Sequence, residues 1–174
     1  VKEIISKIQK DNKQEKKETY EVINPATEEA IGKASKASSV DVDKALKSAE
    51  KGLKVWRNTP PWQRSYIIRK IADLMREKKN NLAKWLTLEV GKPLAEGVGE
   101  VGGAADIFEW NAEETKRIYG QTVESRFPDS RVHVYYQPVG VVAALVPWNF
   151  PIVLASRKIS TALAAGCSVI CKPD

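Results

Sequence analysis

Three side chains near the end of this 174-residue chain have types suited to chemistry: Trp148, Asn149 and Lys172. An asparagine amide can donate a hydrogen bond to a developing oxyanion without losing a proton itself. A lysine ammonium can hold the hydroxyls or phosphates of a nucleotide. The competing interpretation makes Asn149 a helix cap and Phe150 its hydrophobic staple, and leaves Lys172 as a solvated strand end. From the residues alone, both interpretations stay open.

A predicted strand–helix–strand unit positions these side chains. Val141–Val146 is a continuous apolar run, as expected of a strand buried on both faces of a parallel sheet. Pro151 suits the first turn of a helix that Gly166 closes, and Ser168–Cys171 is typical of a second short strand. Neighbouring parallel strands lie about 4.8 Å apart, and ligands of such sheets bind beyond the carboxyl ends of the strands. If the two strands are neighbours, the three side chains share one rim.

A hairpin and helices are predicted before this unit. Short β-branched runs flank Asn24-Pro25, which predicts a hairpin there. Apolar residues at helical spacing then predict three helical segments, which are separated by Thr59-Pro60-Pro61 and Gly91-Lys92-Pro93 and end near Tyr119. Residues 131–137 alternate in polarity, which predicts a strand with one more polar face.

Several features that resemble functional motifs have ordinary explanations. Gly97–Gly102 matches G-x-G-x-x-G literally, but no strand precedes it, so we expect either the glycines of a closely packed helix or a short loop beside it. Cys167 is expected at a helix-to-strand turn and Cys171 in a buried strand, and neither is assigned a catalytic role. His133 is expected on a strand surface, and no metal site is predicted.

The composition, with 43% apolar and 29% charged residues, is that of a soluble globular protein. The net charge of +6 suggests nucleic-acid binding, but the lysines of Val1–Glu18 alternate with acidic residues and lack aromatic neighbours. We therefore expect a solvated leader, which also lacks the apolar segment of a secretory signal. The two cysteines favour a reducing compartment. The cytoplasm is predicted, with neither nucleic acid nor membrane as a partner.

The order and spacing of several motifs resemble the aldehyde dehydrogenase family from about Tyr20 onward. The matching motifs are Ile23–Thr27, Glu89–Pro93, Glu109-Trp110, Val146–Pro151, Leu163–Cys167 and Lys172-Pro173. The resemblance implies an α/β fold in which a hairpin and N-terminal helices lead into a partial parallel sheet, the first βαβ unit of a truncated cofactor domain. The expected divisions are the hairpin and helical part of the cofactor-binding domain at 1–120, an oligomerisation arm at 121–138 and the first βαβ unit at 139–174.

The resemblance also implies roles for individual residues. Asn149 would act catalytically as the side-chain half of an oxyanion hole. Val146, Pro147, Trp148 and Asn149 would line the nicotinamide side of bound NAD or NADP, and Lys172 would hold the adenosine ribose hydroxyls. The nucleophilic cysteine and the general-base glutamate of the family lie downstream, so the 174-residue chain alone is expected to be inactive. The position that helps to choose between NAD and NADP also falls just past the last residue.

Two further stretches, Glu113–Gly120 and Ser156–Lys158, resemble the succinate-semialdehyde dehydrogenase branch. In that branch, the arginine that matches Arg157 faces the substrate carboxylate, which a planar guanidinium can grip in two places. The alternative is a helix arginine in a surface salt bridge. The expected function is oxidation of succinate semialdehyde, or a related ω-carboxylate semialdehyde, to the acid by a homodimer or homotetramer. A truncated, non-catalytic family member with a structural or partner-binding role is the alternative.

Overall fold

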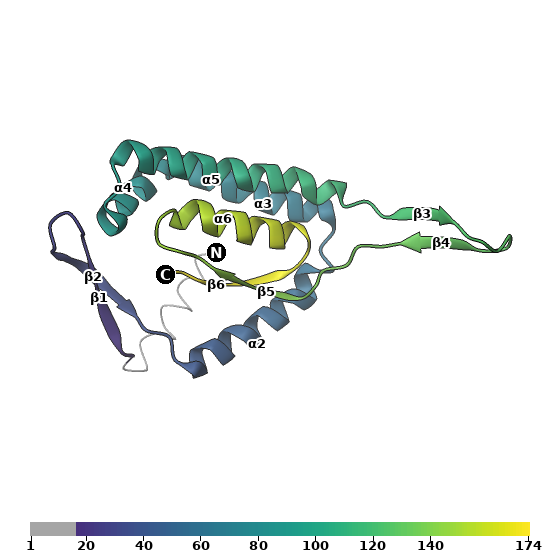
Figure 1. The fold of residues 1–174 in the computed structure, drawn as a ribbon, viewed down its shortest axis with the longest axis horizontal. Helices are drawn as coiled ribbons and strands as arrows, with labels where there is room; N and C mark the ends of the chain where they lie inside the picture. The colour runs from purple at the N-terminus through teal and green to yellow at the C-terminus, as the bar shows by residue number, and fades with distance from the viewer. Residues whose placement is uncertain (1–16) are drawn as a thin grey trace.

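The computed structural model describes residues 17–174, which form a mixed α/β structure with a projecting arm (Figure 1). The predicted solvated leader lies outside the described residues, except for its last two positions. Within residues 17–174, every helix is too short or too polar to cross a membrane.

The predicted N-terminal hairpin is confirmed: β1 (Thr19–Ile23) pairs antiparallel with β2 (Ala30–Ser35). Asn24 starts the turn, because its side-chain oxygen accepts a hydrogen bond from the backbone N–H of Ala26 at 2.9 Å. Such a bond closes a turn within the local sequence, so the hairpin needs no distant contact to begin.

Helix α2 (Ser39–Trp56) follows the hairpin and begins with a capping box. The Ser38 hydroxyl accepts from the Asp41 N–H at 3.2 Å, and the Asp41 carboxylate accepts from the Ser38 N–H at 3.0 Å. This reciprocal pair satisfies two backbone donors that a helix start would leave free. The Trp56 indole at the other end donates to the Leu163 carbonyl at 2.8 Å, which ties α2 to a later helix.

Three helices lie between α2 and the arm: α3 (Pro61–Glu77), α4 (Lys79–Val90) and α5 (Leu94–Glu114). A proline at its first helical position starts α3, where a missing N–H costs nothing. Helix α5 is shorter than predicted, because the short 3-10 turn η1 (Thr115–Arg117) replaces its expected end.

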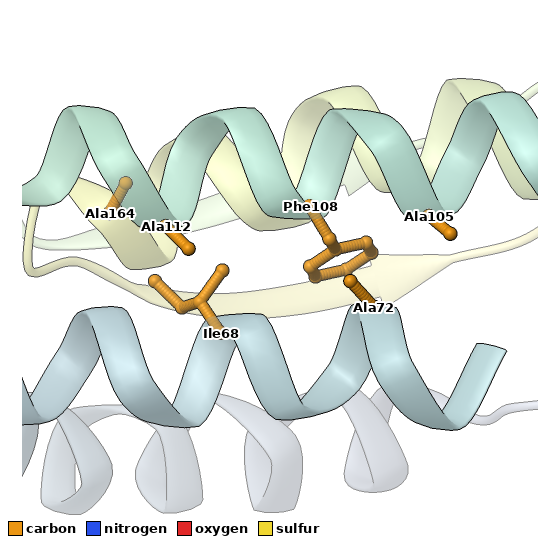
Figure 2. Close-up of a cluster of buried hydrophobic side chains, with 6 residues drawn as sticks. All are labelled: Ile68, Ala72, Ala105, Phe108, Ala112 and Ala164. Carbon is orange, nitrogen blue, oxygen red and sulfur yellow. The ribbon is translucent and has the colours of Figure 1, made fainter. Parts of the chain in front are cut away.

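The hydrophobic core lies where α3, α5 and α6 (Pro151–Ala164) meet. Small side chains allow these helices to approach closely, and Ile68 and Phe108 fill the space that remains. Figure 2 shows the buried side chains Ile68, Ala72, Ala105, Phe108, Ala112 and Ala164. The core thus fixes the position of α6 relative to α5.

Strands β5 (Val141–Leu145) and β6 (Ser168–Lys172) flank α6 and pair in parallel, which confirms the predicted βαβ unit. Helix α6 lies on one side of the pair and α2 on the other (Figure 1). The prediction that the first strand is buried on both faces is wrong, because Leu145 is 63% exposed whereas Ala144 is buried. Within residues 17–174 this sheet consists of two strands, and α2 contacts β6 more than β5.

Strands β3 (Gln121–Glu124) and β4 (Arg131–Val134) form an antiparallel hairpin that projects from the body (Figure 1). The strand predicted at 131–137 ends at Val134, because β3 begins at its partner Gln121 and offers nothing opposite the next residues. All residues of both strands are exposed. His133 lies on this strand surface as predicted, with Nδ1 3.1 Å from the Thr122 hydroxyl.

Candidate active site

The carboxyl ends of β5 and β6 form one rim, as the sequence predicted. Leu145 lies opposite Lys172 in the ladder, and the Val146 N–H donates to the Lys172 carbonyl at 3.0 Å. Val146 is buried, so only its backbone can contact a ligand at the rim. Trp148 is 65% exposed, and Asn149 and Lys172 are also exposed. The rim therefore offers an aromatic surface, an amide and an ammonium to solvent.

Asn149 lies in the short loop between β5 and α6. The interpretation of Asn149 as the cap of α6 is wrong, because Phe150 occupies the cap position and no side chain of the loop caps the helix. Within residues 17–174, the Asn149 side-chain amide makes no hydrogen bond. Its N–H groups are therefore available to an acceptor outside this chain segment.

Glu100 does the capping instead, from a different helix. One oxygen of its carboxylate, Oε1, accepts from the Ile152 N–H at 3.0 Å and from the Val153 N–H at 3.2 Å. These are the first free donors of α6, because Pro151 at the first position has no N–H. A carboxylate is also favoured there by the positive end of the helix dipole. Glu100 thus fastens the start of α6 to α5.

Lys92 completes this buried cluster. Its ammonium pairs with the second oxygen of Glu100, and the two side chains are only 8% and 1% exposed. The same ammonium donates to the backbone carbonyl of Asn149 at 3.1 Å and lies 3.9 Å from the centre of the Phe150 ring. The loop that carries Asn149 is therefore held by a lysine that precedes α5 and a glutamate within it.

Sequence reasoning missed Lys92 and Glu100. The glycine motif Gly97–Gly102 lies inside α5 as predicted, and a Cβ at Gly97 would lie 3.0 Å from the Ala83 carbonyl oxygen, which confirms close packing. Glu100 sits among these small residues, where a carboxylate is expensive to bury without a partner. A single acid within a run of glycine, valine and alanine was the available signal for a buried ion pair.

Arg157 lies on the exposed side of α6. Within residues 17–174 it makes no ion pair, so the surface salt bridge that sequence reasoning allowed is not found in this part of the chain. Its guanidinium is available to a carboxylate from another source.

The two cysteines differ in environment. Cys167 is buried at the turn after α6, as predicted. Cys171 was expected in a buried strand, and this prediction is wrong, because Cys171 is exposed near the end of β6. Among the residues that the structure describes, no group of His, Cys, Asp and Glu side chains is arranged to hold a metal ion.

Residues 12–174 match the sequence model of the aldehyde dehydrogenase family. The chain is 46% identical over 156 residues to a glutarate-semialdehyde dehydrogenase of Pseudomonas putida. The aligned region covers 90% of this chain and 32% of that protein. It is 44% identical over 156 residues to a succinate-semialdehyde dehydrogenase of Escherichia coli whose name specifies NADP(+), with the same two coverages of 90% and 32%.

Solved structures give the same result for the fold. The crystal structure of an NADP-dependent enzyme of Escherichia coli superposes with a TM-score of 0.89 at 43% identity, covering 90% of this chain and 33% of that one. A succinate-semialdehyde dehydrogenase of Burkholderia pseudomallei superposes with a TM-score of 0.87 at 40% identity, covering 88% of this chain and 32% of that one. The chain thus spans about a third of the length of the relatives it matches.

Proposed function

Because the chain belongs to the aldehyde dehydrogenase family, we propose that it forms the amino-terminal part of an enzyme that oxidises an aldehyde to the acid. The observation that carries this proposal is the exposed Asn149 amide at the rim formed by β5 and β6. In such a reaction the carbonyl oxygen gains negative charge when a nucleophile adds to the carbon. An amide donor fixed beside that oxygen stabilises the charge, and Asn149 has that role in the proposal.

Members of this family use NAD or NADP, and we propose that the rim binds such a cofactor. When bound, the nicotinamide ring accepts the hydride that the substrate loses. In the proposal, Trp148 and the backbone of Val146 and Pro147 lie beside the nicotinamide ribose. Lys172 is exposed and makes no ion pair within residues 17–174, so its ammonium is available to the hydroxyls of the adenosine ribose.

The substrate we propose is succinate semialdehyde or a related aldehyde with a carboxylate at its far end. The two relatives at 46% and 44% identity are named for glutarate semialdehyde and succinate semialdehyde, both of which carry such a carboxylate. Arg157 supplies a cation on the helix that directly follows the Asn149 loop. Neither Cys167 nor Cys171 is proposed as the nucleophile, so the chain alone is expected to be inactive.

The proposed assembly is a homodimer or homotetramer in which the β3–β4 arm contacts a second subunit. The supporting observation is that all residues of this hairpin are exposed, including Val123, Val132 and Val134. A two-stranded hairpin without cover is marginally stable alone in water, so a partner surface accounts for its length.

Steady-state turnover of the full-length protein tests the proposal. We expect reduction of NAD(+) or NADP(+) that depends on succinate semialdehyde, with acid formed in equal amount. Reduction that does not depend on any aldehyde, or its absence with both cofactors and a panel of aldehydes, would favour the non-catalytic alternative.

A further inference from the structure

The Asn149 amide has no hydrogen bond of its own within residues 17–174, so its direction depends on the backbone that carries it. That backbone is held on both sides of the loop. On one side, the Lys92 ammonium donates to the Asn149 carbonyl at 3.1 Å. On the other, Glu100 accepts the N–H groups of Ile152 and Val153 at 3.0 and 3.2 Å. The two anchors are joined to each other by their ion pair.

We propose that the buried Lys92–Glu100 pair positions the Asn149 amide for catalysis. This inference rests on the proposed function, because it takes the oxyanion role of Asn149 as its premise. The two side chains are 8% and 1% exposed, so they act through Asn149 rather than by touching substrate. They are positioning residues, and neither is a catalytic one.

The pair is poorly explained as a device for stability alone. Removing two charges from water is costly, and apolar side chains of similar volume stabilise a fold as well or better. A charged pair does offer something that apolar packing does not, namely directed hydrogen bonds to a chosen carbonyl and chosen N–H groups. All three backbone groups that it binds lie within Asn149–Val153. The geometry points to control of this one loop.

Small displacements of a positioned donor have large kinetic effects, because a catalytic group must meet the reacting atoms in a narrow range of geometry. Lys92→Met keeps much of the apolar stem but removes the bond to the Asn149 carbonyl. Turnover of the full-length enzyme with succinate semialdehyde is expected to fall about tenfold to a hundredfold, whereas KM for the nicotinamide cofactor changes by less than about threefold. Glu113→Gln is the matched control on α5, because Glu113 pairs with Arg69 and Lys116 away from this loop. Its kcat is expected to stay at the parent value.

A single substitution leaves one buried charge without a partner, which destabilises the fold, so the double variant Lys92→Met/Glu100→Gln provides a second test. In it no lone charge remains, and the melting temperature is expected to return toward that of the parent while kcat stays low. Recovery of kcat together with the melting temperature would overturn the inference and leave the pair a purely structural one.

Combination with Asn149→Ala separates the inference from the proposed function. If the pair acts through Asn149, Lys92→Met lowers kcat further by less than about threefold once the amide is absent. An equal loss from Lys92→Met with and without the amide would contradict the positioning role and leave the oxyanion role intact. If Asn149→Ala alone leaves kcat unchanged, the oxyanion role itself fails, and the inference that rests on it fails with it.

Discussion

Arg157 is the residue that decides substrate choice in the proposed function. It is exposed on α6 and makes no ion pair within residues 17–174, so its guanidinium is free to bind a carboxylate. It lies six residues after Pro151, less than two turns along a helix with about 3.6 residues per turn. The proposed role requires that this long side chain reach a substrate held near Asn149.

We predict that Arg157→Ala lowers kcat/KM for succinate semialdehyde about tenfold to a hundredfold, which is the usual range for a charge-assisted hydrogen bond. Butanal has the same length without the carboxylate, so its kcat/KM should change little. Lys158→Ala is the control, because Lys158 is also exposed on α6 and its substitution removes a charge of the same sign. Equal losses on both aldehydes would make Arg157 a structural residue.

At the scale of elements, the turn between α6 and β6 sets where the second strand starts. Gly166 has a φ of +85°, and a Cβ there would lie 2.9 Å from the Pro138 side chain. An L residue with a side chain is strained in this conformation. The conformation of this turn therefore helps to determine where β6 begins and where Lys172 lies at the rim.

Gly166→Ala should lower the free energy of unfolding by about 1 to 3 kcal/mol, the usual cost of a strained backbone conformation. Gly52→Ala is the matched control, because Gly52 lies within α2 and a Cβ there meets nothing within 4 Å. That substitution should stabilise the protein by about 0.5 to 1 kcal/mol. Denaturant unfolding of both variants measures the two changes in the free energy of unfolding, which should have opposite signs. An unchanged free energy of unfolding for Gly166→Ala would contradict a strained turn.

Helices α3 and α5 are also joined by surface ion pairs. A hydrogen bond from Arg76 holds the pKa of the Glu109 carboxyl below its ordinary value of 4.5. Hydrogen bonds from Lys116, the larger cause, and from Arg69 likewise lower the pKa of the Glu113 carboxyl. A lowered folded-state pKa means that the stabilisation is present above the ordinary value and is lost as the pH falls through the folded value. Acid should therefore weaken the contact between α3 and α5.

We predict that the melting temperature of the parent falls more steeply below about pH 4.5 than that of Glu109→Gln, which has no carboxylate to protonate there. High salt should reduce the difference between the two, because these pairs are at the surface. If the melting temperatures of the two proteins fall equally with pH at low salt, the ion pairs contribute nothing measurable to stability.

The elements that local sequence determines were predicted well. The turn at Asn24-Pro25 and the helix break at Thr59-Pro60-Pro61 depend on neighbours in the chain. The pairing of β5 with β6 also followed from their apolar runs and the helix between them. The contacts of Lys92 and Glu100 with the Asn149 loop could not be predicted in this way, because they form only when α5 packs against α6 and they join residues 52 to 57 positions apart in sequence. The exposure of Cys171 was likewise not predicted from its apolar neighbours in sequence.

At the scale of the whole molecule, the arm has two different faces. Val123 pairs with Val132 on one face, and Val134 lies two residues further along the same side. Thr122 pairs with His133 on the opposite face. The exposed apolar face supports the proposal that a second subunit covers the arm.

We predict that Val132→Lys shifts the full-length protein toward smaller assemblies, because it places a charge on the apolar face. The control is His133→Lys, which adds a charge to the polar face of the same strand and should leave the assembly unchanged. Light scattering after size-exclusion chromatography measures both. The same mass for parent and Val132→Lys at every concentration would contradict a role of this face in assembly.

Whether the rim of β5 and β6 is the active site of an aldehyde dehydrogenase is tested most directly by one rate constant. In the full-length enzyme, Asn149→Ala removes a single oxyanion donor and should lower kcat for succinate semialdehyde by about 10²- to 10³-fold. The dissociation constant of the nicotinamide cofactor should change far less, because Trp148 and Lys172 remain. A kcat within about threefold of the parent would contradict the oxyanion role and leave the Asn149 amide without a catalytic function.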